Sequence, residues 1–350
     1  MDYVELSPPT DHERVLLCQD KRSGLHAIVA IHNTRLGPAM GGCRRWCYPN
    51  ESDALLDVLN LSQGMTYKNA LAGLPIGGGK SVILSHLPGV AISEGQLAAF
   101  GEFVETLKGA YIAAEDVGMG VPDLKKIAEH TRFVTGVNPV AAGGFGGDPS
   151  PNTALGVLKG IKMAVRFKLG RSDLGGLSVA VQGLGHVGYH LCKLLFAEGV
   201  KLTVTDIDAE RMNAVRESFN AKLVAPEEIL FQKTDVISPC AMGGVLHETV
   251  VTRLKCSIVA GAANNQLKSK TVGALLASRN ILYAPDYVIN AGGIISASYE
   301  YMQGTEASWV SAKINNISTQ LEKIFTLAEC SGRPTNIVAD ELAMEIIRAS

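Results

Sequence analysis

The alternation of apolar and polar residues predicts short buried strands separated by longer amphipathic helices. In the first part of the chain, the strands are expected at 26–31, 81–84 and 111–114, and the helices after Ser52 and near 92–108. Ser52 offers a side-chain oxygen of the kind that caps a helix, and the leucines and Met65 after it recur at helical spacing. The glycine-rich stretch 74–80 is expected to end this helix.

The second part of the chain follows the strongest break in the pattern. Residues 141–151 hold too much glycine and proline to continue a helix or a central strand, so they indicate a domain boundary with hinge potential, or a plain surface loop. Beyond them, strand and helix patterns alternate. The strands are expected at 177–181, 201–205, 235–238, 257–260 and 281–284, and the helices at 152–167, 187–197 and 308–348. This alternation predicts an α/β fold with a doubly wound, mainly parallel sheet.

The composition is that of a compact protein long enough for two domains. Of its 350 residues 47% are apolar and 19% charged, and the net charge of −2 argues against a nucleic-acid or anionic-membrane partner. The N-terminus lacks the pattern of a secretory signal, and no apolar run is long enough to cross a bilayer. The seven dispersed cysteines indicate reduced thiols, so we expect a cytoplasmic location. No second Cys/His pair follows Cys43 and Cys47, so we expect no metal.

A glycine motif stands between a predicted strand and a predicted helix in the second part. It consists of Gly183, Leu184, Gly185, His186, Val187 and Gly188. In this context Gly183 allows a tight turn, Gly185 lets the backbone approach a pyrophosphate, and Gly188 allows close packing of helix on strand. The helix N-terminus would offer its N–H groups to the phosphates. The motif predicts a dinucleotide site; the alternative is a glycine turn that binds no nucleotide.

Asp206 ends the next predicted strand and indicates which dinucleotide is bound. A carboxylate there accepts hydrogen bonds from both ribose hydroxyls and repels a 2′-phosphate, which favours NAD over NADP. Asp208 adds to that repulsion, whereas Arg211 nearby leaves NADP open. The predicted cofactor is NAD.

Two lysines and an aspartate are the candidate catalytic groups of the first part. Lys80 directly follows three glycines, which leave the backbone accessible to a flat ligand. Out of water and beside the ammonium of Lys68, Lys80 would lose part of its proton affinity and become a usable base. Asp116 ends an apolar strand, where active-site carboxylates of α/β proteins often lie.

Each of these groups also has a simpler explanation. The lysines could be a solvated pair, and Asp116 a helix N-cap or a surface acid. The asparagines at 264, 265 and 290 could serve only turn formation. A phosphate-binding P-loop is rejected, because Leu74 stands where that motif requires its first glycine.

Seven segments, in order over nearly the whole chain, resemble the glutamate/leucine/phenylalanine/valine dehydrogenase family, and within it the leucine dehydrogenase branch. They are 36–42 (LGPAMGG), 64–68 (GMTYK), 77–80 (GGGK), 114–118 (AEDVG), 238–241 (SPCA), 260–267 (AGAANNQL) and 283–293 (YAPDYVINAGG). The resemblance implies a catalytic domain over 1–147 completed by a C-terminal helix at about 330–350, a Rossmann-type NAD-binding domain over 148–329, and a cleft between them. It also implies a homo-oligomer, either a dimer or an octamer.

The resemblance further implies the roles of individual residues. Lys80 would be the base that activates water, Lys68 would bind the substrate carboxylate, and Asp116 would carry protons to and from the amino group. The other substrate-binding positions are Met40, Gly41, Gly42, Met65, Ala114, Asn265, Ile294 and Ala297. The cofactor-binding positions are the six residues of the glycine motif, Asp206, Ile207, Thr153, Cys240, Ala241 and Asn265.

The implied reaction is the reversible deamination of an apolar L-amino acid to its 2-oxo acid and ammonia. Met40 stands where glutamate dehydrogenases have a lysine for the side-chain carboxylate, and an apolar wall would leave that carboxylate unpaired. Leucine, valine and isoleucine are the leading substrates, with phenylalanine or tryptophan as the alternative because Ala297 deepens the pocket. Two other classes are a catalytically silent NAD-binding regulator and a 2-oxo acid reductase that needs no ammonia. The intact set of Lys68, Lys80 and Asp116 favours the dehydrogenase.

Overall fold

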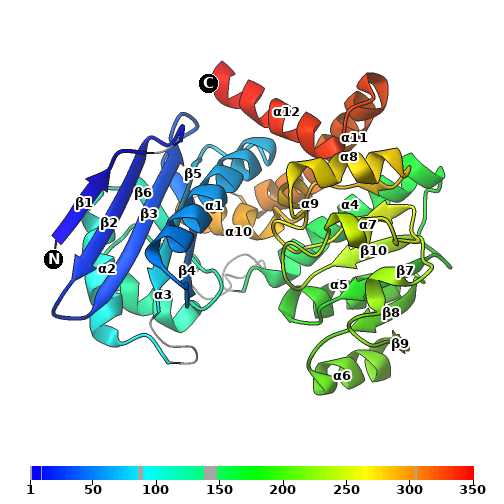
Figure 1. Cartoon of the computed structure of the whole chain (residues 1–350), viewed down its shortest axis with the longest axis horizontal. Helices are drawn as coiled ribbons and strands as arrows, with labels where there is room; N and C mark the ends of the chain where they lie inside the picture. Colours follow the sequence, from blue (N-terminus) through cyan, green and yellow to red (C-terminus); the bar gives the residue numbers. More distant parts are fainter. Residues whose placement is uncertain (1, 9, 86–89, 138–147, 304–305) are drawn as a thin grey trace. The chain divides into compact units, whose positions relative to one another are not determined.

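The structure is a computed structural model that describes residues 2–8, 10–85, 90–137, 148–303 and 306–350. The contacts within the chain divide it into two units, which Figure 1 shows with their elements labelled. Unit 1 comprises Met1–Asp148, Ile294–Val310 and Ala343–Ser350, and unit 2 comprises Pro149–Gly293 and Ser311–Leu342. The hinge expected over 141–151 falls mostly on 138–147, which lie outside the described residues.

Unit 1 is built on a six-stranded mixed sheet with the order β1-β2-β3-β5-β4-β6. Its strands are β1 (Asp2–Leu6), β2 (Arg14–Asp20), β3 (Leu25–Asn33), β4 (Ala39–Trp46), β5 (Gly77–Leu84) and β6 (Tyr111–Ala114). The pairings from β1 through β3 to β5 are antiparallel, whereas β4 runs parallel to both β5 and β6. Strand β4 therefore lies between β5 and β6, and all three strands run parallel.

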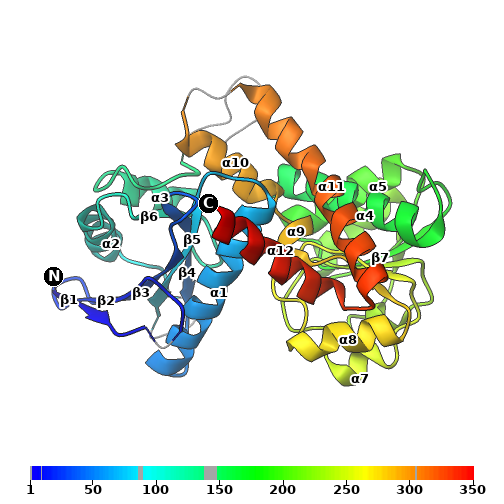
Figure 2. The same cartoon turned by 90° about the horizontal axis from the view of Figure 1, so that it is seen from above.

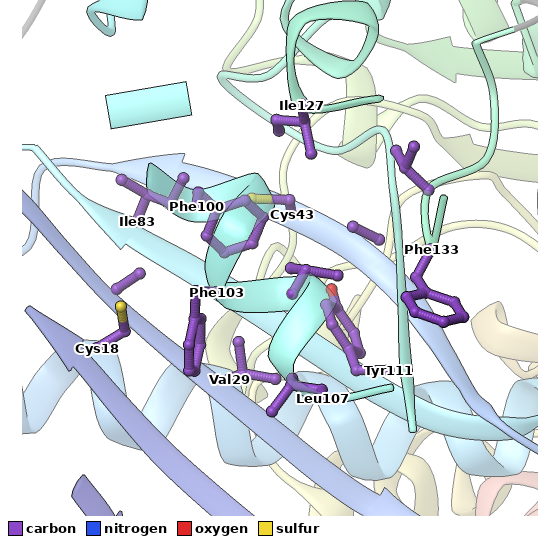
Figure 3. Close-up of a cluster of buried hydrophobic side chains, with 14 of the residues drawn as sticks. Cys18, Val29, Cys43, Ile83, Phe100, Phe103, Leu107, Tyr111, Ile127 and Phe133 are labelled. Carbon is purple, nitrogen blue, oxygen red and sulfur yellow. The ribbon is translucent and has the colours of Figure 1, made fainter. Parts of the chain in front are cut away.

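The side chains of β3 show how helices cover both faces of this sheet. The helices are α1 (Glu51–Leu71), α2 (Glu94–Thr106) and α3 (Val121–Ala128). Ile28 and Ala30 pack with α1, whereas Val29 and Ile31 join the cluster of α2 and α3 that Figure 3 shows. Successive strand residues point to opposite faces. Helix α1 therefore lies on one face, and α2 and α3 lie on the other (Figure 2).

Unit 2 is built on a parallel sheet with the order β12-β11-β10-β7-β8-β9. Its strands are β7 (Ser178–Gln182), β8 (Lys201–Thr205), β9 (Lys222–Leu223), β10 (Val236–Pro239), β11 (Ile258–Val259) and β12 (Leu282–Tyr283). All pairings between them are parallel. When the strands are counted from β7, the order is 3-2-1-4-5-6, that of the Rossmann fold. The predicted doubly wound sheet is confirmed.

The remaining helices follow the strands of unit 2 or divide between the two units. Unit 2 holds α4 (Ser150–Leu169), α5 (His186–Ala197), α6 (Ala209–Phe219), α7 (Glu248–Val251), α8 (Lys270–Ser278), α9 (Asp286–Ile289) and the short 3-10 helix η1 (Ile229–Phe231). Three helices have residues in both units, namely α10 (Gly292–Tyr301), α11 (Ala307–Ser331) and α12 (Thr335–Ala349). The C-terminal part of unit 1 thus includes 294–310 as well as the end of the chain.

Some local predictions were wrong. The N-cap of α1 is Asn50 rather than Ser52, because the Asn50 side chain accepts a hydrogen bond from the backbone N of Asp53 at 2.9 Å. Strand β5 begins at Gly77 rather than at residue 81, because glycines 77–79 form its first part. They can do so because a Cβ atom on Gly78 would lie 2.1 Å from the backbone N of Thr66, so only glycine fits between sheet and helix. Strands β1, β2, β4 and β9 were not predicted.

Candidate active site

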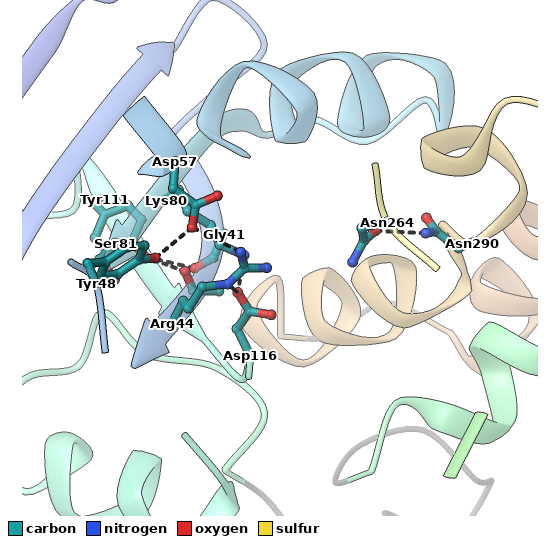
Figure 4. A network of polar contacts seen from close by, with 11 residues as sticks. Gly41, Arg44, Tyr48, Asp57, Lys80, Ser81, Tyr111, Asp116, Asn264 and Asn290 are labelled. Carbon is teal, nitrogen blue, oxygen red and sulfur yellow. Dashed lines mark hydrogen bonds and ion pairs between the residues drawn. The ribbon is translucent and has the colours of Figure 1, made fainter. Parts of the chain in front are cut away.

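Lys80 and Asp116 form an ion pair in unit 1. Lys80 lies on β5, and Asp116 follows the end of β6, which is paired with β4 at Gly42 and Ala114. Lys80 Nζ lies 2.6 Å from Asp116 Oδ2, and the two side chains are only 7% and 12% exposed (Figure 4). The order of the three parallel strands thus brings together two of the three catalytic groups predicted from the sequence.

Gly42 provides the space that this ion pair occupies. A Cβ atom on Gly42 would lie 2.7 Å from Asp116 Cβ and 3.0 Å from Lys80 Nζ. Such approaches are shorter than packed side chains allow. The close approach of Lys80 and Asp116 therefore requires glycine at this position.

Three further side chains, which were not predicted, extend the network around Asp116. Arg44 Nε donates to Asp116 Oδ2 at 3.2 Å, and Arg44 Nη1 donates to Asp57 Oδ2 at 3.0 Å. Tyr48 OH donates to the same Asp57 oxygen at 2.6 Å (Figure 4). Arg44 lies two residues after Gly42 on β4, so its side chain points to the same face. Because β4 was not predicted, no signal in the sequence identified Arg44.

The cations of this network control the charge of Asp116. Burial acts to raise the pKa of the Asp116 carboxyl, but Lys80 and Arg44 oppose it, and the pKa lies below its usual value. Asp116 is therefore ionised at neutral pH. A buried carboxylate that stays ionised can accept a proton from a bound reactant.

Tyr111 supports the site from the opposite face of the sheet. Its hydroxyl donates to Gly41 O at 2.9 Å and lies 2.9 Å from Ser81 Oγ. A Cβ atom on Gly79 would lie 2.8 Å from the Tyr111 ring, so the ring can pack against β5 only because residue 79 is glycine. Burial raises the pKa of Tyr111 well above its usual value, so the hydroxyl keeps its proton and holds the Gly41 carbonyl in place.

Lys68, the third predicted catalytic group, lies on the helix that covers the Lys80 side of the sheet. It is partly buried in the last turn of α1. This end of α1 is packed tightly on β5 through Gly78 and Thr66. All three predicted catalytic residues therefore belong to unit 1, on adjoining elements.

The predicted substrate pocket residues also belong to unit 1, apart from Asn265. They are Met40, Gly41, Gly42, Met65, Ala114, Ile294 and Ala297. Met65 Cγ lies 3.3 Å from the position that a Cβ atom of Gly41 would take. The Ala297 carbonyl accepts a hydrogen bond from Thr135 Oγ1 at 2.8 Å, which fastens α10 to the segment after β6. Thr135 was not predicted.

The glycine motif of unit 2 has the geometry of a dinucleotide-binding turn. Gly183 has a φ of +95°, and a Cβ atom on Gly188 would lie 2.0 Å from Gly183 O. Gly185 is the N-cap of α5, and a Cβ atom there would meet nothing within 4 Å. Two glycines are thus needed for the turn itself, whereas the third leaves open space at a helix N-terminus. The N-terminus of a helix carries a partial positive charge, so this open space suits the negatively charged pyrophosphate of a dinucleotide.

Several other predicted cofactor residues lie around this turn. Asp206 Oδ2 accepts a hydrogen bond from the backbone N of Leu184 at 2.5 Å, so its carboxylate stands beside the motif. Ile207, next to it, is 97% exposed. On the other side, a Cβ atom on Gly183 would lie 2.6 Å from Ala241 Cβ, and the backbone N of Cys240 donates to Gln182 O at 2.7 Å.

The roles predicted for Asn265 and Thr153 remain predictions. Asn265 is exposed and has a φ of +52°, which fits the turn chemistry considered for it. Asn290 orders the same segment, because its Nδ2 donates to Asn264 Oδ1 at 2.7 Å (Figure 4). Thr153 Oγ1 donates to Pro149 O at 2.9 Å near the start of α4.

Two further observations concern the described part of the chain alone. Among its His, Cys, Asp and Glu side chains, no group of three is arranged to hold a metal ion. None of its helices combines the length and apolar character that spanning a membrane requires.

Comparison with known families identifies the chain's relatives. The model of the Glu/Leu/Phe/Val dehydrogenase, dimerisation domain matches residues 12–133, and the Glutamate/Leucine/Phenylalanine/Valine dehydrogenase model matches residues 198–331. A leucine dehydrogenase from Thermoactinomyces intermedius is 47% identical over 99% of this chain and 93% of its own length. The chain belongs to this family. The family predicted from the sequence is confirmed, and with it a nicotinamide-linked dehydrogenase as the general class.

Two other members of the family show how close its branches are. A valine dehydrogenase from Streptomyces virginiae is 44% identical over 95% of this chain and 92% of its own length. The crystal structure of L-tryptophan dehydrogenase from Nostoc punctiforme matches with a TM-score of 0.82 and 41% identity, over 97% of this chain and 96% of that one. Relatives named for aliphatic and for aromatic amino acids are thus nearly equally similar to this chain.

Proposed function

We propose that the chain catalyses the NAD-dependent, reversible oxidative deamination of an apolar L-amino acid, with leucine, valine or isoleucine as the leading substrates. The observation that carries this proposal is the buried pair of Lys80 and Asp116, 2.6 Å apart beside Gly42, in a member of an amino-acid dehydrogenase family. A buried amine and a buried carboxylate side by side are suited to passing protons at a reacting carbon.

Each charged group of the site has a distinct task in this reaction. Lys68 binds the substrate carboxylate through its ammonium. Asp116 takes a proton from the substrate's ammonium group. The nicotinamide, when bound, would accept the hydride from Cα, so that the substrate becomes an iminium ion. Lys80, as a neutral amine, takes a proton from water as that water adds to the iminium carbon. Asp116 returns its proton to the amino group of the resulting carbinolamine. Ammonia leaves as the hydroxyl group loses its proton to Asp116, so that a 2-oxo acid remains. The buried surroundings of the pair strengthen these contacts.

The preference for an apolar side chain rests on Met40. Met40 is completely buried on β4, one residue before Gly41. A substrate carboxylate placed against it would lose its hydration without gaining a partner, which costs several kcal/mol. Within apolar substrates the pocket discriminates weakly, because one methylene is worth only about 1–3 kcal/mol. Phenylalanine or tryptophan is therefore the second candidate, which the relative named for tryptophan supports.

We assign the cofactor to unit 2 and the chemistry to unit 1. The Asp206 carboxylate lies beside the glycine motif. Its negative charge favours a ribose with an unmodified 2′-hydroxyl and repels a 2′-phosphate, so NAD is the proposed cofactor. The name of the matching N-terminal model, a dimerisation domain, supports a homo-oligomer. We place the enzyme in the cytoplasm, where its seven cysteines would remain thiols.

A spectrophotometric panel tests the proposed function. NAD and NADP are each offered with the common L-amino acids, and formation of the reduced cofactor is followed. We expect turnover with NAD and a branched-chain amino acid, weaker turnover with aromatic ones, and none with glutamate. The absence of turnover with every aliphatic and aromatic amino acid would refute the assignment.

A further inference from the structure

Arg44 links the catalytic carboxylate to a second carboxylate outside the ion pair. Its Nε and Nη1 contact Asp116 Oδ2 and Asp57 Oδ2 at 3.2 and 3.0 Å, and its side chain is 19% exposed. Tyr48 holds the Asp57 oxygen from the other side at 2.6 Å. The guanidinium is therefore fixed in both position and direction by two carboxylates.

Arg44 can keep a positive charge beside Asp116 when Lys80 is neutral. Both cations contact the same oxygen of Asp116. When Lys80 is neutral, as the proposed reaction requires, Asp116 loses its nearest counter-ion while it remains buried. Burial then favours a protonated carboxyl. A guanidinium does not lose its proton in proteins, so Arg44 remains a cation at every step.

We propose that Arg44 is a positioning residue that keeps the Asp116 carboxylate ionised and in place while Lys80 is neutral, with Asp57 and Tyr48 holding the guanidinium. This inference rests on the proposed function of Lys80 and Asp116. Because Arg44 does not reach the reacting carbon in this role, it acts only through Asp116. A fixed cation of this kind keeps Asp116 a carboxylate while Lys80 is neutral, so that Asp116 is ready to accept a proton from the substrate's amino group.

Other titratable groups also interact electrostatically with Asp116. They include Lys80 on β5, Cys43 on β4, Tyr48 after β4 and Tyr111 on β6. Helix α1 contributes Asp57 through Arg44. Burial raises the pKa values of Cys43, Tyr48 and Tyr111, so these groups stay neutral at the pH where the enzyme would work.

The first test is the pH dependence of kcat/KM for deamination in Arg44→Gln. Loss of a cation in contact with the carboxylate raises its proton affinity, so we expect the acidic limb to move to higher pH by about one pH unit or more. Asp57→Asn removes an anion from the network and should move the limb the other way. Arg44→Lys should restore much of the limb's position, because it restores the charge.

Arg45→Gln is the matched control. Arg45 is the next residue on β4 and carries the same charge, but its Nη2 donates to Ser85 Oγ at 3.0 Å, away from Asp116. Its profile should match that of the unchanged enzyme. A limb that moves equally in Arg44→Gln and Arg45→Gln, or that moves in neither while Arg44→Gln loses only kcat, would overturn the inference in favour of a general charge effect or a structural role.

The second test needs no turnover. The Asp116 carboxyl is titrated by 13C NMR in protein labelled at aspartate, and its signal is assigned by its loss in Asp116→Asn. We expect the titration in Arg44→Gln to lie about one pH unit or more above that of the unchanged protein. An unchanged titration contradicts the inference even if the enzyme deaminates amino acids. A shifted titration in a chain without deamination would refute the proposed function and leave the electrostatic role of Arg44 standing.

Discussion

Gly42 shows how the chemistry of the site depends on a missing side chain. Lys80 and Asp116 are brought together by neighbouring strands, but they meet only because no Cβ atom lies between them. The glycine pair at 41–42 therefore provides more than backbone freedom. It sets the distance between a base and an acid.

We expect Gly42→Ala to separate this pair and to lower kcat by about 100-fold, since a displacement of about 1 Å at a reacting group has an effect of that size. NAD binding should be unchanged, because the glycine motif lies in unit 2. Steady-state kinetics and nucleotide titration by fluorescence measure the two effects. Gly64→Ala, where a Cβ atom would meet nothing within 4 Å, is the matched control and should keep full activity. Near-normal kcat in Gly42→Ala would show that the close pair is not needed.

Asp206 is the residue on which the choice of cofactor depends. We expect Asp206→Asn to raise the KM for NAD about tenfold and to weaken discrimination against NADP, because a charged acceptor for the ribose hydroxyls is lost. The control is Asp208→Asn, since Asp208 caps α6 and asparagine is an equally good cap. If the ratio of kcat/KM for the two cofactors is the same in Asp206→Asn and in the unchanged enzyme, our interpretation of Asp206 is wrong.

At the scale of elements, the sequence predicted strands whose apolar residues form a continuous run and helices whose apolar residues recur at helical spacing. The apolar run at 26–31 and the Rossmann strands other than β9 were found because continuous burial leaves a continuous apolar run in the sequence. Strand β4 and the start of β5 were missed because their glycines carry no apolar signal. What makes them strands is tertiary packing, through Thr66 above the sheet and Tyr111 below it.

The candidate site was predicted in the same uneven way. Lys68, Lys80 and Asp116 lie in motifs that resemble those of a known family, and this resemblance implied their roles. Arg44 and Asp57 were not found, because their importance comes from strand register and from the position of α1 over the sheet. Neither can be obtained from residue order alone.

The packing of α1 on β3 also includes a buried pair of histidines with consequences for stability. The rings of His12 and His32 lie 4.7 Å apart, and His32 Nδ1 lies 2.8 Å from Thr66 Oγ1. Burial, followed by the nearby His12, lowers the pKa of His32 to about 4. His32 therefore binds a proton near pH 6.5 in the unfolded chain, but only near pH 4 in the folded chain.

We expect the free energy of unfolding to fall as the pH drops from about 6.5 to 4, with His32 contributing roughly 3 kcal/mol of that loss. In His32→Asn this part of the pH dependence should disappear. Denaturant unfolding at a series of pH values measures it, with the exposed His130→Asn as the control. A curve for His32→Asn parallel to that of the unchanged protein would contradict the assignment.

At the scale of the whole molecule, the chain separates its tasks between two units. Unit 1 holds every predicted catalytic side chain, and unit 2 holds the glycine motif with Asp206. The chain passes from one unit to the other within α10, α11 and α12 as well as near Asp148. The two family models follow this division, since one matches residues 12–133 in unit 1 and the other matches residues 198–331, most of which are in unit 2.

The most direct test of the central claim is the oxidation of NADH with the 2-oxo acid of leucine, measured with and without ammonium in the unchanged enzyme and in Lys80→Ala. We expect NADH oxidation only when ammonium is present, and we expect it to be lost in Lys80→Ala while NADH still binds. Oxidation that is equally fast without ammonium, or that persists in Lys80→Ala, would contradict it.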